Sequence, residues 1–275
     1  MTTPLVTVQW LHQNLNDPDL VILDASPATN KAGITAEQQH LQISGARFFD
    51  LKHTFSDATS ELPNTLPSPD QFEAECRKIG INRTSKIVVY DNLGVYTSPR
   101  VWWMFRTMGH ENVAVLNGGL PHWQAQGFDT VPRDVASVEA GNFSAALQPN
   151  LVVDHTFVKS NLESKNALVI DARSKGRFDG TAPEPRAGLR SGHIPDSLNL
   201  PYTEVLENGK FKSETELTAI FSRLVNDKRP LVFSCGSGVT ACILALAANV
   251  LDNDNISVYD GSWTEYGTLT NVKED

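Results

Sequence analysis

Short apolar runs alternate with longer amphipathic stretches along most of the chain. Runs of this length, rich in β-branched residues, are typical of strands buried on both faces. Helical periodicity begins after Ser68, where Ser-Pro-Asp forms a capping pattern, and again near Ser213. The predicted strands cover residues 20–23, 87–90, 113–116, 167–170, 231–233 and 256–259. This alternation predicts an α/β fold whose sheets are mostly parallel and flanked by helices.

The pattern occurs twice, at a separation of about 145 residues, which is the period of a duplicated domain rather than of a solenoid. The matching segments are 21–26 with 169–173, 43–46 with 194–197, 86–91 with 229–235, and 117–123 with 260–266. In this alignment Asp91 stands where Cys235 stands. If the cysteine is catalytic, only the second copy can carry that chemistry.

The stretch between the two copies is polar, contains proline and interrupts the strand and helix pattern. We therefore predict an N-terminal domain over residues 1–135, a linker over 136–150 and a C-terminal domain over 151–275. Each domain is long enough to bury a hydrophobic core of its own.

Composition and net charge limit the kinds of molecule that the protein is expected to bind. The formal net charge of the 275 residues is -9, a field that repels nucleic acid and anionic membranes, so neither is expected as a partner. The longest apolar run, residues 243–250, is too short to span a bilayer. A small anionic substrate would need a local cluster of arginine or lysine. Three cysteines and a first segment without export features predict a reducing compartment, the cytoplasm.

The sharpest local feature is the segment Leu231-Val-Phe-Ser-Cys-Gly-Ser-Gly-Val-Thr-Ala-Cys242, which predicts a buried strand, a glycine-containing loop and a buried helix. Such a loop turns its N–H groups inward, and the helix dipole points the same way. Cys235 at its centre should exist largely as a thiolate and could carry an anionic persulfide. Cys76 and Cys242 fall within helical patterns and are expected to be core residues.

Other chemistries fit the same residues poorly. A cysteine phosphatase loop needs an arginine six positions after the cysteine, and that position is Ala241. A serine hydrolase needs Gly-x-Ser-x-Gly, which is absent here. The histidines and cysteines are scattered without metal-ligand spacing, so neither a metal nor another cofactor is predicted.

The loop Cys235-Gly236-Ser237-Gly238-Val239-Thr240, taken with the duplication, resembles that of the tandem rhodanese-domain sulfurtransferases. Its form is similar to the 3-mercaptopyruvate sulfurtransferase branch, because the thiosulfate-preferring branch usually carries cationic side chains inside this loop. Further family signatures are the segments 98–106, 192–195 and 259–263. The resemblance covers nearly the whole chain and implies two tandem rhodanese-like domains, the first without the catalytic cysteine.

By this resemblance, Cys235 is the catalytic residue and takes sulfur from 3-mercaptopyruvate as a persulfide, releasing pyruvate. Arg177 and Arg186, in the family's Gly-Arg-Phe and Glu-Pro-Arg elements, would hold the carboxylate and keto oxygen of the donor. Considered without the family, both arginines could be solvated surface charges. Ser237 could donate to the donor sulfur or simply fit the loop, and Thr240 is expected to cap the helix.

The resemblance also implies the acceptor class: cyanide, a small thiol or a thioredoxin-like protein. Three alternatives stay open at this point. Thiosulfate could be the main donor, the chain could be a non-catalytic binding module, or it could be a sulfur carrier serving a biosynthetic pathway.

Some positions depart from the family pattern or are less certain. The first half reads Gln42-Ile-Ser-Gly where the family usually has His-Ile-Pro-Gly, with His40 two residues earlier. Any role of that histidine is therefore absent or moved to His40. His193, in the matching element of the second half, is expected to be structural. Arg190 lies near the two predicted substrate arginines, and the sequence leaves its role open.

Overall fold

The computed structural model describes residues 1, 3–28, 39–134, 138–225 and 228–270. The chain divides into two compact units. Unit 1 comprises Met1–Ala58, Leu66–Gln148 and Asn208–Phe211, and unit 2 comprises Thr59–Thr65, Pro149–Glu207 and Lys212–Asp275. The boundary predicted between residues 135 and 136 lies outside the described residues, and the predicted domain limits stay a prediction.

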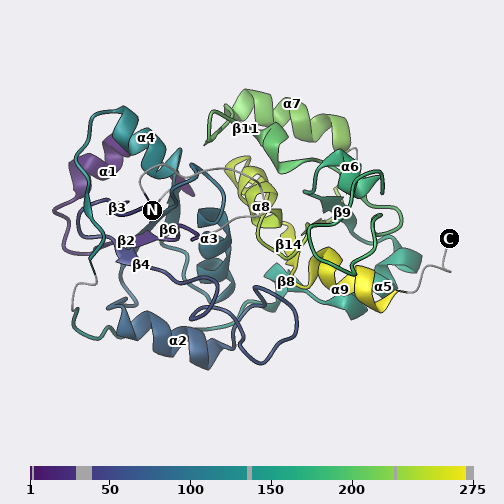
Figure 1. The fold of residues 1–275 in the computed structure, drawn as a ribbon, viewed down its shortest axis with the longest axis horizontal. Helices are drawn as coiled ribbons and strands as arrows, with labels where there is room; N and C mark the ends of the chain where they lie inside the picture. The colour runs from purple at the N-terminus through teal and green to yellow at the C-terminus, as the bar shows by residue number, and fades with distance from the viewer. Residues whose placement is uncertain (2, 29–38, 135–137, 226–227, 271–275) are drawn as a thin grey trace. The chain divides into compact units, whose positions relative to one another are not determined.

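Unit 1 contains a five-stranded parallel sheet in the order β1-β6-β5-β2-β4. Figure 1 labels β2, β4 and β6 among these strands. Its strands are β1 (Leu5–Val6), β2 (Leu20–Asp24), β4 (Arg47–Phe48), β5 (Lys86–Tyr90) and β6 (Val113–Leu116). Its helices are α1 (Val8–Asn14), α2 (Pro69–Lys78), α3 (Ser98–Thr107) and α4 (Gly119–Ala125). The short strands β3 (Leu41–Gln42) and β7 (Val131–Pro132) form an antiparallel pair.

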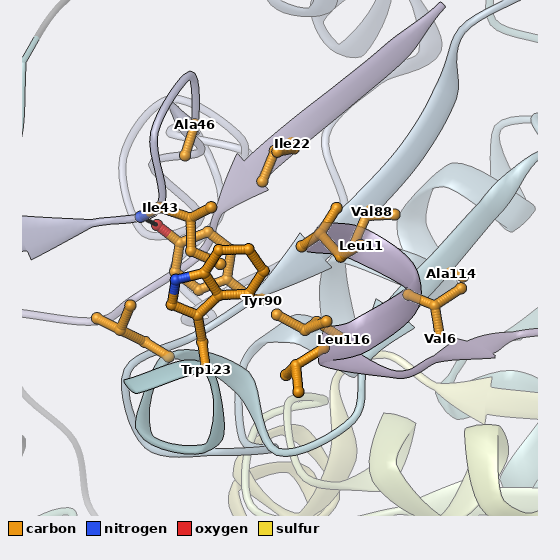
Figure 2. Packing of buried hydrophobic residues seen from close by; sticks show 12 residues of the cluster. Val6, Leu11, Ile22, Ile43, Ala46, Val88, Tyr90, Ala114, Leu116 and Trp123 are labelled. Carbon is orange, nitrogen blue, oxygen red and sulfur yellow. Dashed lines mark hydrogen bonds between the residues drawn. The ribbon is translucent and has the colours of Figure 1, made fainter. Parts of the chain in front are cut away.

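Alternate residues of each strand point to opposite faces of this sheet, so both faces are apolar. Val88 and Tyr90 of β5 contribute to the same buried cluster as Leu11 of α1 and Trp123 of α4, and Figure 2 shows these side chains together. A second aromatic cluster contains Phe72 of α2. Helices therefore cover both faces of the sheet.

Unit 2 repeats this architecture with a parallel sheet in the order β10-β9-β13-β14-β8. Its sheet strands are β8 (Val152–Val153), β9 (Leu168–Asp171), β10 (Leu198–Asn199), β13 (Leu231–Ser234) and β14 (Ile256–Tyr259). Its α-helices are α5 (His155–Ser164), α6 (Lys175–Phe178), α7 (Glu214–Leu224), α8 (Ala241–Val250) and α9 (Ser262–Leu269). Unit 2 also contains the 3-10 helices η1 (Pro149–Leu151) and η2 (Tyr202–Val205) and the short strand β11 (Leu206–Glu207), whereas the short strand β12 (Lys210–Phe211) belongs to unit 1.

The predicted duplication and parallel α/β fold are confirmed. Reading the second sheet from its other edge, β8, β14, β13, β9 and β10 correspond to β1, β6, β5, β2 and β4. All six predicted strands occur within one residue of their expected limits. Both copies thus place the loop after their central strand, β5 or β13, at the carboxyl edge of a sheet, where parallel α/β folds put their ligands.

The predicted helix starts are confirmed where a side chain caps the first turn. Ser68 accepts a hydrogen bond from the N–H of Gln71, and Ser213 forms a reciprocal capping box with Glu216. Helix α8 begins at Ala241, directly after Thr240. No helix in the described ranges is long and apolar enough to cross a membrane.

Candidate active site

Cys235 lies at the carboxyl end of β13, the central strand of unit 2, immediately before the loop that leads into α8. The strand is buried along its whole length, and the residue itself is only 2% exposed. Helix α8 is almost entirely apolar and buried. The loop is therefore held between two rigid elements, with Gly238 at a φ of +75° where it reverses direction.

The first turn of α9 fastens this loop. The carbonyl of Cys235 accepts from the N–H of Trp263 at 3.0 Å, and the carbonyl of Gly236 accepts from the N–H of Thr264 at 3.1 Å. Ser262, buried and at a φ of +50°, accepts through Oγ from the N–H groups of Cys235 (3.2 Å) and Gly238 (3.1 Å). A serine in this backbone region is strained, which the surrounding hydrogen bonds compensate.

This arrangement corrects one expectation. The N–H groups of Cys235 and Gly238 are bound by Ser262, so they do not face an anion on the sulfur. The N–H groups of four other loop residues have no hydrogen-bond acceptor among the residues that the structure describes. These residues are Gly236, Ser237, Val239 and Thr240. They supply the donors that the loop can offer to a thiolate, a persulfide or an oxyanion.

The matching loop of unit 1 already holds an anion. The carboxylate of Asp91, which replaces the cysteine, accepts from the N–H groups of four residues of its own loop at 2.9 to 3.0 Å. These residues are Leu93, Tyr96, Thr97 and Ser98. A strand, loop and helix of this type therefore aims several N–H groups at a negative charge one residue past the strand.

Arg177, in α6, lies against the cysteine loop. A Cβ atom added to Gly236 would lie 2.9 Å from its Nη2 atom, so the absence of a side chain there permits the close approach. The guanidinium is also bidentate to Glu184, through Nε at 3.1 Å and Nη2 at 2.6 Å. Glu184, whose side chain is 1% exposed, also accepts from Arg173 at 2.8 Å, and Arg173 is paired with Asp171.

The side chain of Arg186 makes fewer hydrogen bonds than that of Arg177, the other predicted substrate arginine. Its Nη1 donates to the hydroxyl of Thr264 at 3.1 Å. Burial lowers the pKa of Arg186; a negative charge on Cys235 opposes this decrease, Arg177 adds to it, and Glu184 opposes it. These couplings indicate that Cys235, Glu184 and both arginines form one electrostatic cluster.

Sequence reasoning missed Asn64. Its Nδ2 donates to the Oγ of Ser237 at 3.0 Å, and its φ is +59°. The segment Thr59–Thr65 precedes the second copy by many residues yet belongs to unit 2. The only sequence signal is an asparagine beside a proline, a residue type that tolerates left-handed backbone. Ser237, predicted in the loop, therefore has a fixed hydroxyl partner.

One expectation about the neighbouring residues needs correction, and Arg190, which the sequence left open, has defined contacts. Thr240 occupies the capping position of α8, but its side chain makes no capping bond, because its backbone is helical (φ -73°, ψ -17°) rather than extended. Arg190 stacks on the ring of Trp263 at 4.5 Å and donates to Thr270 at 2.6 Å, so it supports α9.

His193, Gln42 and His40 lie in or beside the two elements that correspond to the family's His-Ile-Pro-Gly pattern. His193 pairs through Nδ1 with the carbonyl of Phe178 at 2.9 Å and stacks on its ring, which agrees with a structural part. Gln42 is buried and donates to the carbonyl of Ala46 at 3.3 Å. His40 is exposed.

The other two cysteines are buried core residues, as predicted. Cys242 donates through Sγ to the carbonyl of Gly238 at 3.2 Å. Burial within α2 raises the pKa of Cys76 well above its ordinary value. Across the described ranges, no group of three or more potential metal ligands occurs.

Comparison with known proteins agrees with this geometry. Residues 7–126 and 154–268 each match the family described as "Rhodanese-like domain". The chain is 41% identical over 277 residues to the 3-mercaptopyruvate sulfurtransferase of Escherichia coli strain K12, with 98% of this chain and 97% of the relative covered. It is 43% identical over 290 residues to thiosulfate/3-mercaptopyruvate sulfurtransferase 1, mitochondrial, of Arabidopsis thaliana, with 96% and 76% covered.

A solved structure extends the likeness to three dimensions. The crystal structure of the 3-mercaptopyruvate sulfotransferase SseA from Escherichia coli matches with a TM-score of 0.83 and 40% sequence identity. The match covers 95% of this chain and 99% of that chain.

Proposed function

Since the chain belongs to the rhodanese family, as a tandem-domain sulfurtransferase of the 3-mercaptopyruvate sulfurtransferase branch, we propose that Cys235 carries the transferred sulfur as a persulfide. The observation that carries this proposal is the set of four N–H groups in the Cys235 loop that have no acceptor among the described residues, on a loop whose counterpart binds the Asp91 carboxylate. A persulfide anion on Cys235 needs the same kind of stabilisation.

In the first step the Cys235 thiolate attacks the thiol sulfur of 3-mercaptopyruvate. A sulfur–sulfur bond forms, and the carbon–sulfur bond breaks with its electron pair leaving on carbon. The leaving group is the enolate of pyruvate, which takes up a proton to become pyruvate. Cys235 is left as a persulfide, whose charge the loop N–H groups stabilise.

Arg177 and Arg186 supply the positive charge for the donor. Arg177 already uses two of its N–H donors on Glu184, whereas Arg186 uses one on Thr264. We propose that Arg186 takes the donor carboxylate through its free donors and that Arg177 faces the keto oxygen, where the enolate charge develops. Both interactions are charge-assisted hydrogen bonds, which are stronger than hydrogen bonds between neutral groups.

In the second step a nucleophilic acceptor attacks the outer sulfur of the persulfide and the Cys235 thiolate leaves. The proposed acceptor is cyanide, a small thiol or a thioredoxin-like protein, and the two steps predict ping-pong kinetics. The proposed location is the cytoplasm, supported by three cysteines that are all free, although one relative is named mitochondrial.

Thiosulfate is the alternative donor, since the name of the Arabidopsis relative includes both donors. The loop residues 236–240 contain no cation that would suit a dianion, which supports 3-mercaptopyruvate. A non-catalytic module would not need free donors around a cysteine. A sulfur carrier for biosynthesis would use the same persulfide and differ only in its acceptor protein.

The test is intact-protein mass spectrometry after brief incubation with 3-mercaptopyruvate, and separately with thiosulfate, in the absence of reductant. We expect a gain of one sulfur atom, faster with 3-mercaptopyruvate, which cyanide removes and which Cys235→Ala abolishes. A persulfide of equal yield in Cys235→Ala would refute the assignment, and no gain with either donor would favour the binding module.

A further inference from the structure

We propose that Thr264 is a positioning residue that fixes Arg186 to the cysteine loop and thereby sets how strongly an anionic reagent is guided to Cys235. The proposal rests on the proposed function for its biological meaning. It stands on three contacts in the first turn of α9.

The Thr264 hydroxyl uses both of its capacities. It donates to the carbonyl of Gly236 at 2.5 Å and accepts from Nη1 of Arg186 at 3.1 Å. The hydroxyl therefore links the guanidinium directly to the carbonyl of Gly236, the residue that follows Cys235. Arg186 cannot move relative to Cys235 without breaking one of these two bonds.

The guanidinium of Arg186 has no other hydrogen-bond partner in the part of the chain that the structure describes. Arg177, by contrast, is fixed by two bonds to Glu184. Removing the Thr264 hydroxyl would leave Arg186 with its charge but without an anchor, and a long side chain would then sample several rotamers. Arg177 would keep its position.

The internal duplication supports a role tied to the chemistry. Gly119, at a φ of +54°, matches Ser262, so Pro121 of unit 1 matches Thr264. Proline has neither an N–H nor a hydroxyl group, and the unit that contains it has Asp91 in place of the cysteine. The three-way link is thus present in the copy with a nucleophile and lost in the copy without one.

Thr264 also holds Gly236 through its own N–H, at 3.1 Å. This second bond belongs to the backbone and survives any substitution other than proline. Thr264→Val, which is nearly isosteric, removes both hydroxyl bonds, to Gly236 and to Arg186, but the backbone bond should keep the loop in place while Arg186 is released. Thr264→Ser keeps the hydroxyl and should behave as the original residue.

The experiment compares the alkylation rates of Cys235 by iodoacetate and iodoacetamide. The two reagents undergo the same displacement, in which the thiolate bonds to carbon and iodide leaves, but only iodoacetate has a carboxylate. The ratio of the two rate constants measures anion guidance and does not require sulfur transfer. Cys76 and Cys242 are fully buried and should not interfere.

We expect the ratio to fall about 3- to 10-fold in Thr264→Val, the loss of one hydrogen bond to a charged group. Arg186→Gln, which removes the guanidinium charge itself, should give the lowest ratio of the two rate constants. Thr264→Ser should stay within about twofold of the unsubstituted protein, as should Thr218→Val, which removes an exposed threonine hydroxyl in α7. For 3-mercaptopyruvate, Thr264→Val should raise KM by a similar factor and change kcat less.

An unchanged ratio in Thr264→Val, or an equal decrease in Thr264→Ser, would overturn the inference. An unchanged ratio in Arg186→Gln would overturn it as well, because Arg186 would then not guide anions. Failure of the unsubstituted protein to form a persulfide would count against the proposed function alone, since the alkylation ratio does not depend on turnover.

Discussion

Glu184 gives the most informative single substitution. Its carboxylate is 1% exposed and binds two arginines, Arg173 at 2.8 Å and Arg177 at 2.6 Å. Glu184→Gln keeps the shape and removes one negative charge. The cluster of Arg173, Arg177 and Arg186 with Asp171 and Glu184 carries one net positive charge, and the substitution raises it to two. The site should then favour a dianionic donor over a monoanionic one.

The size of this shift follows from Coulomb's law. At an effective dielectric constant of about 20 and a separation of about 7 Å, two unit charges interact by about 2 kcal/mol. Solvent reaches Arg177, whose side chain is 23% exposed, so about 1 kcal/mol is a reasonable remainder, equivalent to about fivefold. Removing one partner of a buried pair should also lower the free energy of unfolding by about 2 to 4 kcal/mol.

The assay measures kcat/KM for thiosulfate and for 3-mercaptopyruvate in both proteins. Activity with each donor should fall, because Arg177 loses its anchor, but the thiosulfate to 3-mercaptopyruvate ratio should rise about fivefold. Asp179→Asn is the matched control, since it removes the same charge from an exposed pair with Lys175 and should leave the ratio within about twofold. A ratio that does not rise in Glu184→Gln would refute the charge argument.

Three further predictions concern the supports of the site. Ser262→Ala should lower the free energy of unfolding by about 2 to 3 kcal/mol in urea titrations and slow persulfide formation, because two buried N–H groups lose their acceptor; an unaffected rate would exclude a role in holding the loop. Cys242→Ala should form the Cys235 persulfide within about threefold of the original rate by mass spectrometry, since a buried thiol that donates to a carbonyl is a packing group; complete loss would indicate a second sulfur site. Burial lowers the pKa of His110, so the native state disfavours its charged form, and stability present above pH ~6.5 is lost as pH falls through the lowered pKa. His110→Gln should flatten this decrease in free energy of unfolding between about pH 7.5 and about pH 5.5, and an identical pH dependence in both proteins would contradict the assignment.

Local patterns predicted most of the framework. Buried parallel strands need continuous apolar runs, so the central strands β5 and β13 were visible from the residues alone. Side-chain caps such as Ser68 are equally local, because donor and acceptor are three residues apart. The duplicated order of these segments was enough to predict that both sheets have the same topology.

The expectation for the loop was right about the order of strand, loop and helix and wrong about two of its donors. The N–H groups of Cys235 and Gly238 donate to the hydroxyl of Ser262. That hydroxyl comes from a residue 27 positions later. No residue near Cys235 in the sequence indicates this contact, because it depends on how the first turn of α9 packs beside the loop.

The sequence by itself determined that only the second copy contains the proposed nucleophile, Cys235, and which arginines are available, because residue type and strand order are properties of the chain. The tertiary structure decided which partner binds each of these side chains. Glu184 binds Arg177, Thr264 binds Arg186, and Asn64 donates to Ser237. The reason is physical. Backbone hydrogen bonds within helices and strands follow local periodicity, whereas contacts between side chains far apart along the chain depend on distances that only the packed fold sets.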